Sequence, residues 1–418
     1  MTELLAPAGT PEAMRYAFAY GADAVYAGQP RYSLRVRNNA FDDAALVAAI
    51  DEAHARGRRL YVAVNVLPHP AKVATFLEDL APVAEAGPDA FIMADPGLIR
   101  LVRRRWPDLP IHLSVQANTL NAEAVKFWAD VGIARVILSR ELGLEEIAAI
   151  RAECPHTELE VFVHGALCIA YSGRCLLSGY FNHRDPNQGT CTNACRWDYR
   201  LHPAEDAAFC LEEGRRPGEY LPIDEDEHGT YILNSKDLRA VQHVGALMDM
   251  GIDCLKIEGR TKSPFYVARA TRTYRRAMDD HLAGRPFDPR LMADLEGLAN
   301  RGYTEGFYRR HLPQEYQNYE EGSSRARRQQ WVGEVVDWAD GWARVRVKNR
   351  FAVGDELVLM TPAGDHPFTL QALEDARGRA RDHAPGDGWE VRIPWPVDPG
   401  PHALLLRHLP APVAVTPG

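Results

Sequence analysis

The strongest constraint on the fold is a repeated unit, in which a short apolar run ends in small or polar residues and a stretch of helical period follows. Eight such runs occur, at residues 4–9 (LLAPAG), 23–28 (DAVYAG), 60–66 (LYVAVNV), 90–95 (AFIMAD), 111–118 (IHLSVQAN), 135–140 (RVILSR), 159–165 (LEVFVHG) and 254–260 (CLKIEGR). Eight strands that alternate with helices predict a parallel (β/α)8 barrel of the TIM type. A doubly wound sheet is the alternative.

With 418 residues the chain is longer than one ordinary domain, and the pattern of apolar and polar residues changes along it. The barrel pattern extends over residues 1–297, and one long insertion at about 166–227 interrupts it before a helix-like segment at 236–250. Residues 298–330 are polar and lack a clear period, which predicts a linker. From 331 to 418, short alternating runs separated by Gly, Asp and Pro predict a small antiparallel β-barrel domain.

Composition and charge narrow the class of protein. Hydrophobic residues make up 46% and charged residues 25%, as in globular proteins. No basic and apolar leader opens the sequence and no run approaches the ~18 apolar residues that span a bilayer, so we expect a cytoplasmic protein without a membrane partner. The net charge of −9 argues against indiscriminate binding to nucleic acid, although it leaves room for local basic patches.

Polar residues follow the apolar runs, where a barrel of this type carries its active site. For any one of them, the alternative is an ordinary solvated loop residue. Four are candidate catalytic residues because their side chains exchange protons or hydrogen bonds: Gln116, Asn118, His164 and Glu258. The remaining candidates at the strand ends are Asn65, Asp95, Ser114, Ser139, Arg140 and Arg260.

The first half of the insertion carries four of the seven cysteines, Cys168, Cys175, Cys191 and Cys195. Thiols in the cytosol stay reduced, so this group indicates a metal or redox site rather than a disulfide framework. Four thiolates meet the requirement of one 4Fe-4S cluster. Two alternatives stay open on spacing alone: a structural zinc, which usually has two close cysteine pairs, and inert buried cysteines.

The segments EVFVHGALC (160–168) and GRCLLS (173–178) resemble the signature of the collagenase-like peptidase family U32. LLAPAG, GADAVYAG, SVQAN, RDPNQGTCTNACRW and KIEGRTKSPFYVARATRTYRRA also resemble this family, so the likeness covers both domains. Within it, the chain is most similar to the branch that hydroxylates the wobble uridine of tRNA to 5-hydroxyuridine, with prephenate as the source of the hydroxyl group. The resemblance implies an oxygen-independent hydroxylation supported by a 4Fe-4S cluster, with the anticodon loop of tRNA as partner.

The resemblance also bears on the cluster ligands. In some relatives the fourth cysteine lies in a segment equivalent to residues 222–231, where this chain has no Cys. Cys195 is therefore the expected fourth ligand. Four cysteine ligands leave no open iron, which favours an electron-transfer or structural role for the cluster and adds an electron donor to the expected partners.

Arginines supply the expected binding groups for both substrates. Prephenate has two carboxylates, which guanidinium groups bind through paired hydrogen bonds. The candidates for that role are Arg35, Arg37, Arg140, Arg174 and Arg260. Arg269, Arg272 and Arg276 recur at three- and four-residue steps and are expected to share one helix face that follows an RNA backbone, the alternative being a solvated outer helix of the barrel.

Other functions compete with tRNA hydroxylation. Sibling branches of the family act on a ribosomal RNA cytidine or on ubiquinone precursors. A peptidase, which the family name suggests, needs a nucleophile with a base or a catalytic metal; the sequence has no HExxH motif, and His164 is the best lone candidate base. A noncatalytic assembly factor, with the C-terminal β domain as its docking module, is the third alternative, and the polar strand ends argue against it.

Overall fold

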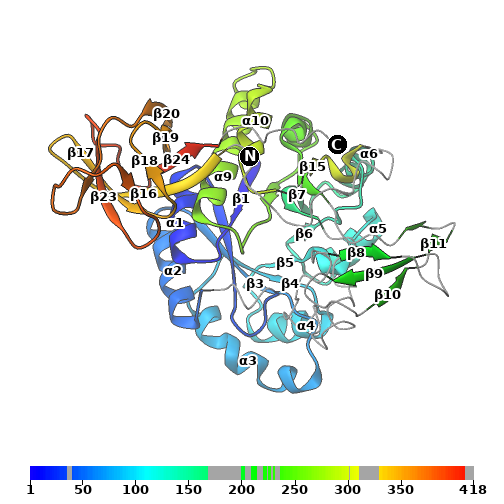
Figure 1. Ribbon diagram of the computed structural model, residues 1–418. Coiled ribbons are helices and arrows are strands. Elements are labelled where there is room, and N and C mark those ends of the chain that lie inside the picture. Colours follow the sequence, from blue (N-terminus) through cyan, green and yellow to red (C-terminus); the bar gives the residue numbers. More distant parts are fainter. Residues whose placement is uncertain are drawn as a thin grey trace.

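The structure is a computed structural model that describes residues 1–34, 40–167, 199–202, 209–213, 220–223, 225–226, 229–230, 236–300, 302–309 and 329–409. Its larger part is a barrel of parallel strands enclosed by helices, and a smaller β domain lies beside α1 and α9 (Figure 1). Among the helices described, none has both the length and the apolar character that crossing a bilayer requires.

All eight predicted runs form parallel strands that pair in sequence order. They are β1 (Glu3–Pro7), β2 (Ala24–Gly28), β3 (Arg59–Val64), β4 (Ala90–Met93), β5 (Ile111–Leu113), β6 (Arg135–Ile137), β7 (Glu158–Ala166) and β14 (Cys254–Ile257). The last strand, β14, pairs with β7 on one side and β1 on the other, which closes the cylinder. The predicted barrel is therefore confirmed, and the doubly wound sheet is excluded.

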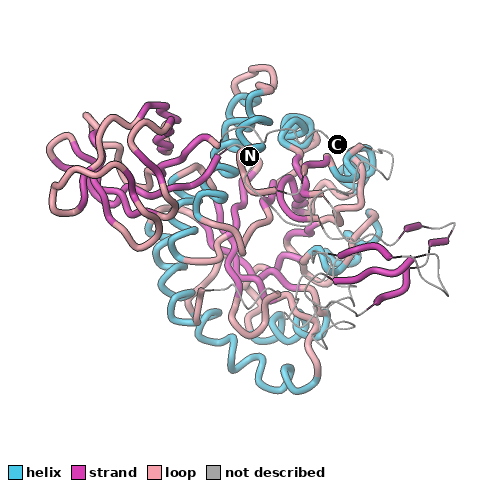
Figure 2. Tube along the Cα trace, in the orientation of Figure 1, coloured by secondary structure: helices cyan, strands magenta, loops and turns pink. Residues whose placement is uncertain are grey.

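Helices cover the outside of the strands, as Figure 2 shows. The α-helices of the barrel are α1 (Pro11–Ala19), α2 (Asp43–Ala55), α3 (Pro70–Glu85), α4 (Pro96–Arg105), α5 (Ala122–Asp130), α6 (Leu144–Glu153), α8 (Val244–Asp249), α9 (Pro264–Leu282) and α10 (Arg290–Glu296). Several begin at a residue whose side chain accepts a hydrogen bond from the first turn: Thr10 caps α1, Asp42 caps α2, Asp95 caps α4 and Ser263 caps α9. Short 3-10 helices are η2 (Val115–Ala117), η5 (Val241–His243) and η6 (Gly306–Tyr308).

Two further strands join the barrel sheet where the sequence indicated other structure. β13 (Asp237–Arg239) pairs antiparallel with the end of β7, and β15 (Tyr303–Thr304) pairs parallel with β13. The helix-like segment at 236–250 therefore begins with a strand, and the first part of the expected linker at 298–330 contains β15 and η6. Such short strands have no local periodic signal, because their partners are distant in the sequence and pairing overrides propensity.

Part of the insertion forms small antiparallel sheets of its own. β8 (Tyr199–His202), β9 (Phe209–Glu213) and β10 (Tyr220–Ile223) form one, and β11 (Glu225–Asp226) pairs with β12 (Gly229–Thr230). In Figure 1 the three-stranded sheet projects from the barrel on the side away from the C-terminal domain.

The C-terminal domain is antiparallel β structure, as predicted. Its strands are β16 (Gln329–Ala339), β17 (Trp342–Val347), β18 (Phe351–Ala352), β19 (Glu356–Thr361), β20 (Gly364–Thr369), β21 (Glu374–Asp375), β22 (His383–Ala384), β23 (Glu390–Pro394) and β24 (Leu404–His408). Seven of them pair in the order β20-β19-β24-β16-β17-β23-β21, and β18 pairs with β22. Val332, Val345, Leu359, Ile393 and Leu405 belong to a separate core inside this domain.

Two of the arginines expected to contact RNA instead join the domains. Arg269 is 1% exposed and donates to Asp365 of β20 at 2.5 Å, and Arg272 donates to the same carboxylate at 2.6 Å. The two side chains share one face of α9, as predicted, but the C-terminal domain covers that face. The prediction that this face follows an RNA backbone is corrected for Arg269 and Arg272. Arg276, whose side chain is 51% exposed, pairs with Asp288.

Candidate active site

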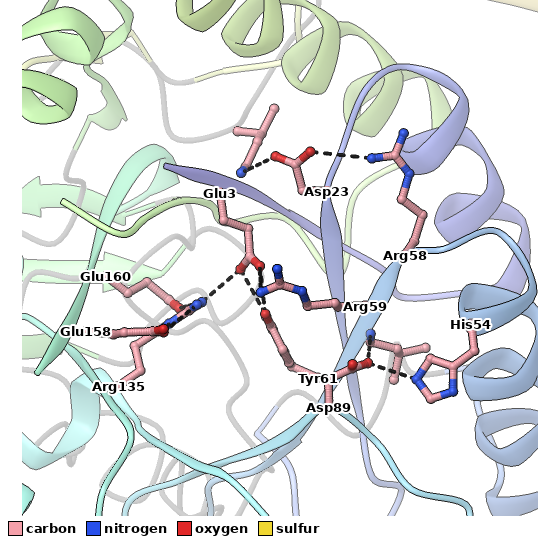
Figure 3. A network of polar contacts seen from close by, with 12 residues as sticks. Glu3, Asp23, His54, Arg58, Arg59, Tyr61, Asp89, Arg135, Glu158 and Glu160 are labelled. Atoms are coloured by element: carbon pink, nitrogen blue, oxygen red, sulfur yellow. Dashed lines mark hydrogen bonds and ion pairs between the residues drawn. The ribbon is translucent and has the colours of Figure 1, made fainter. Parts of the chain in front are cut away.

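Charged side chains fill the interior of the barrel from its amino-terminal end upward. Arg135 of β6, which is 3% exposed, donates to Glu3 of β1 at 2.8 Å and to Glu158 of β7 at 2.8 Å. The hydroxyl of Tyr61 on β3 donates to the same Glu3 carboxylate at 2.8 Å (Figure 3). Glu158 lies on the neighbouring strand, whereas β1, β3 and β6 are not neighbours, so Glu3, Tyr61 and Arg135 meet across the interior of the cylinder.

The next layer of the interior holds a second ion pair. Glu160 of β7 is fully buried and accepts from Lys256 of β14 at 2.7 Å, while Arg135 lies 3.4 Å from its other oxygen. The ammonium group of Lys256 also lies 4.5 Å from the ring centre of Tyr26 on β2. Buried charges are tolerated only when partners compensate them, so this network fixes its members in position.

His112 of β5 adds a neutral imidazole to the interior. Its ring packs against Tyr61 with a centroid distance of 4.7 Å. Burial lowers the pKa of His112 well below its usual value, and the positive charges of Arg135 and Lys256 lower this pKa further. A neutral histidine beside cations is suited to accept a hydrogen bond rather than to carry charge.

At the carboxyl-terminal end of the strands, the barrel mouth gathers three predicted residues. The guanidinium of Arg140, after β6, lies 3.6 Å from the ring centre of Phe162 and 3.5 Å from the carboxylate of Glu258, after β14. Arg260 donates to the carbonyl of Leu34 at 2.7 Å and lies over the ring of Tyr26. The ammonium group of Lys256 lies 4.5 Å from the ring centre of Tyr26 and 5.4 Å from that of Phe162, so three cationic side chains gather on this side with the carboxylates of Glu160 and Glu258.

Two glycines allow this close assembly. A Cβ at Gly28 would lie 2.3 Å from Nη1 of Arg260 and 2.5 Å from Oγ of Ser33. Gly165 has a φ of +103°, and a Cβ there would lie 2.4 Å from the carbonyl oxygen of Glu258. Each glycine therefore makes room for a candidate residue on the final strand or directly after it.

A chain of polar side chains crosses the other side of the mouth. The amide of Asn65, after β3, lies 3.4 Å from Oγ of Ser114, which lies 3.1 Å from Oε1 of Gln116. Asn118 adopts left-handed backbone with a φ of 51°, and its amide donates to the carbonyl of Gln116 at 3.0 Å. Gln116 and Asn118 thus lie together at the end of β5, as the sequence indicated.

His164, the expected lone base, lies outside the barrel interior. Its ring packs against Tyr266 and Tyr274 of α9 and Tyr303 of β15, with centroid distances of 5.5 to 5.6 Å. Burial lowers the pKa of His164 to about 3, although Asp237 acts in the opposite direction. The imidazole is therefore neutral at physiological pH, and its contacts support a packing role between β7 and α9.

This buried histidine predicts acid sensitivity. In the unfolded chain His164 takes up a proton near the ordinary histidine pKa of 6.5, whereas in the folded chain its pKa is about 3, so the unfolded state binds more protons between these values. We expect the free energy of unfolding to fall below pH 6.5, with about 1.4 kcal/mol per pH unit from this residue. Urea unfolding at pH 7 and pH 5 measures the slope. His164→Phe should reduce it and Tyr303→Phe should retain it; equal slopes in both variants would contradict the assignment.

Several predicted residues fall outside the described part of the chain. They are Arg35, Arg37, Cys168, Arg174, Cys175, Cys191 and Cys195. Within the described ranges, no cluster of three or more His, Cys, Asp or Glu residues is arranged to hold a metal. Leu167, which directly precedes Cys168, follows the carboxyl-terminal end of β7, and the chain returns from the insertion through β13, where Asp237 pairs with Ala166. Both described ends of the insertion therefore adjoin the mouth.

Sequence reasoning missed most of the interior residues. Glu3, His112, Arg135, Glu160 and Lys256 were not singled out from the strand patterns. A signal was present, because Glu158, Glu160 and Phe162 alternate along β7, and Cys254 and Lys256 alternate along β14 with Glu258 directly after it. A period of two places such residues on one side of a strand, and charges there in a buried barrel strand indicate an interior polar network.

Comparisons with known proteins agree with this architecture. Residues 9–318 match peptidase family U32, and residues 327–407 match the peptidase family U32 C-terminal domain. A tRNA hydroxylation protein P from Escherichia coli (strain K12) is 58% identical, covering 97% of this chain and 96% of that protein. A 23S rRNA 5-hydroxycytidine synthase from the same organism is 33% identical, covering 77% of this chain and 44% of that protein. A Methanocaldococcus jannaschii protein named as an uncharacterized protease is 35% identical, covering 86% of this chain and 87% of that protein. This chain belongs to peptidase family U32.

Proposed function

We propose that this protein is a tRNA hydroxylase that forms 5-hydroxyuridine at the wobble position, without oxygen and with prephenate as the source of the hydroxyl group. The observation that carries the proposal is the 58% identity to a tRNA hydroxylation protein over nearly the whole chain. The arginines at the mouth, Arg140 and Arg260, support it, because both expected substrates are anionic. In this proposal the anticodon loop presents its wobble base to the mouth, flipped out of the loop.

The described residues suggest how the mouth handles a dicarboxylate. Arg140 is held flat on Phe162 and beside Glu258, so its guanidinium is oriented before a ligand arrives. Arg260 is held by the carbonyl of Leu34, and Lys256 is held by Glu160 below. We infer that Arg140 and Arg260 bind carboxylates of prephenate, while Glu258 limits how far Arg140 moves. Their fixed positions supply orientation rather than proton transfer.

The proposal includes a 4Fe-4S cluster on the basis of the sequence. Cys168, Cys175, Cys191 and Cys195 provide the four thiolates that a 4Fe-4S cluster requires, and both described ends of the insertion adjoin the mouth. When bound, such a cluster supplies one-electron chemistry or rigid support for the insertion. The residues of the mouth bind and orient the substrates in either case, and an electron donor is a further proposed partner.

Arg140 offers a direct test of carboxylate binding. Lys in its place retains the charge but loses the two-pronged hydrogen bond, so we expect Arg140→Lys to raise the KM for prephenate by about 10- to 100-fold. Steady-state hydroxylation with varied prephenate measures this effect. Arg290→Lys, at a side chain 83% exposed on α10, is the matched control and should leave KM unchanged. An unaltered KM in Arg140→Lys would remove Arg140 from the proposed site.

The protease interpretation has less support from the described residues. A hydrolytic base needs a nucleophile within hydrogen-bonding reach. His164 contacts tyrosines, and within the described ranges its hydrogen-bonding contact is with Tyr274 rather than with a serine or a cysteine. We therefore favour hydroxylation over peptidase activity as the function of this protein.

The proposed function is tested in cells and with purified protein. Nucleoside mass spectrometry should show 5-hydroxyuridine missing from the tRNA of a strain that lacks the gene and restored by the wild-type gene. Anaerobically purified protein should then hydroxylate unmodified tRNA in a single turnover with prephenate. Product in cells but none with the purified, iron-loaded protein would favour an assembly factor, and an unchanged tRNA pool with altered ribosomal RNA would favour the ribosomal alternative.

A further inference from the structure

A directed chain of hydrogen bonds starts at the backbone of Leu34 and crosses the mouth. The amide nitrogen of Leu34 donates to Oδ1 of Asn65 at 3.1 Å. A backbone N–H can only donate, so it fixes which end of the Asn65 amide is the oxygen. The nitrogen Nδ2 therefore faces Ser114 at 3.4 Å and donates to its hydroxyl oxygen.

The next two groups continue the chain. Oγ of Ser114 receives a hydrogen from Asn65 and donates its own hydrogen to Oε1 of Gln116 at 3.1 Å. Oε1 is thereby occupied as an acceptor, which leaves Nε2 at the end of the chain. In this arrangement each hydrogen along the chain from Leu34 to Ser114 has an acceptor, and the Gln116 amide offers two N–H donors at its end.

The end of this chain is buried and unsatisfied. Gln116 is 7% exposed, and its Nε2 has no hydrogen-bond partner within the described structure. Buried amide donors are almost always paired in native proteins, and an unpaired one is costly. Such a group at the end of a barrel strand, beside other candidate residues, indicates that a ligand supplies the missing acceptor.

We propose that the amide nitrogen of Gln116 donates to a keto oxygen of the substrate pyrimidine and so selects uracil over cytosine. This inference rests on the proposed function and assigns its base specificity. Uracil carries an acceptor at the position where cytosine carries an amino donor. A neutral amide suits a neutral carbonyl, whereas the cationic groups for a carboxylate lie at Arg140, Arg260 and Lys256.

Binding of short RNA tests this assignment without catalysis. The probes are two anticodon stem-loops that differ only in U or C at the wobble position, and fluorescence anisotropy gives their Kd values with the holoprotein. We expect the wild type to prefer the U loop by about 10- to 100-fold. Gln116→Ala should abolish this preference, and Gln116→Glu should weaken the U loop at least as much, because its carboxylate opposes the keto oxygen. The KM for prephenate should stay within about twofold in both variants.

Asn65→Asp tests the direction of the chain. The new carboxylate accepts from Leu34 and also accepts the Ser114 hydrogen, so Gln116 turns its nitrogen to Ser114 and presents its oxygen. We expect the preference for U over C to fall at least about tenfold and to move toward C, because an oxygen there accepts from the cytosine amino group. Asn121→Asp is the matched control: Asn121 caps α5 through its side-chain oxygen, which aspartate also supplies, and the preference should stay intact.

The outcomes separate this inference from the function on which it rests. A U preference that survives Gln116→Ala, or a Gln116→Ala effect on the KM for prephenate alone, overturns the role of Gln116. Loss of the preference in Gln116→Ala with no change in Asn65→Asp overturns the directed chain. Wild-type protein that prefers the U loop yet makes no hydroxylated nucleoside supports the inference and overturns the proposed function.

Discussion

Cys175→Ala protein, purified without oxygen, is expected to lose its iron and sulfide and to lose hydroxylation by at least about 100-fold. Replacing a residue that only supports a metal ligand costs about 10- to 100-fold, so removing a ligand should cost no less. The wild type should contain four irons per cluster-loaded chain in the proposed arrangement of Cys168, Cys175, Cys191 and Cys195. Iron and sulfide analysis together with nucleoside mass spectrometry of the complemented deletion strain measure both effects.

The chain supplies its own controls for this experiment. Cys154 and Cys254 are buried thiols in the barrel, and burial raises the pKa of each. Cys154→Ala removes a thiol as Cys175→Ala does, but at a position where Sγ contacts the carbonyl of Ala122. Iron content and hydroxylation should therefore remain near the wild-type level. Full iron in Cys175→Ala, or equal iron loss in Cys154→Ala, would contradict the proposed ligand set.

Glu160→Gln is expected to destabilise the protein by about 3–5 kcal/mol, because it leaves the buried Lys256 ammonium without its countercharge. Arg135 loses part of its compensation as well, since it lies 3.4 Å from the same carboxylate. Total stabilities are only about 5–15 kcal/mol, so a loss of this size lowers the amount of folded protein in cells. Equilibrium unfolding in guanidinium chloride, followed by tryptophan fluorescence, gives the free energy of unfolding.

Two variants bracket this prediction. Glu158 pairs with Arg135 from a side chain that is 51% exposed, so Glu158→Gln should cost less than about 1 kcal/mol. The double variant Glu160→Gln with Lys256→Met removes both charges of the pair and should recover part of the loss. A Glu160→Gln protein that unfolds at the wild-type denaturant concentration would show that the network is not a major source of stability.

The barrel was predictable because each strand carries its own signal. LYVAVNV and AFIMAD are apolar runs bounded by polar residues, and helices with capped starts separate them, so local pattern and global fold agree. The mouth followed from the architecture alone, which placed Gln116, Arg140, Glu258 and Arg260 at strand ends. These residues indeed lie at the mouth.

The parts that were missed depend on partners remote in the sequence. Arg269 and Arg272 looked like a basic helix face, yet Asp365 lies 96 residues from the first and 93 from the second and covers both. β15 consists of Tyr303 and Thr304 alone, and its pairing with β13 leaves no periodic trace. His164 is a residue type that often acts as a catalytic base, but here its ring packs against tyrosines of α9 and β15. This packing became visible only in the structure, because both elements are distant from His164 in the sequence.

Closure by β14 constrains how this chain is made. The ribosome synthesises β1 to β7 first. The strand that joins β7 to β1 is β14, at residues 254–257, and it is synthesised only after the whole insertion. Until β14 is made, β1 and β7 are unpaired edge strands of the nascent sheet, and such edges can pair with other chains. A chain that ends before Cys254 therefore lacks the closing strand, and we expect it to aggregate rather than to form a smaller active enzyme. We also expect ribosome-bound chaperones to protect the two open edges during synthesis.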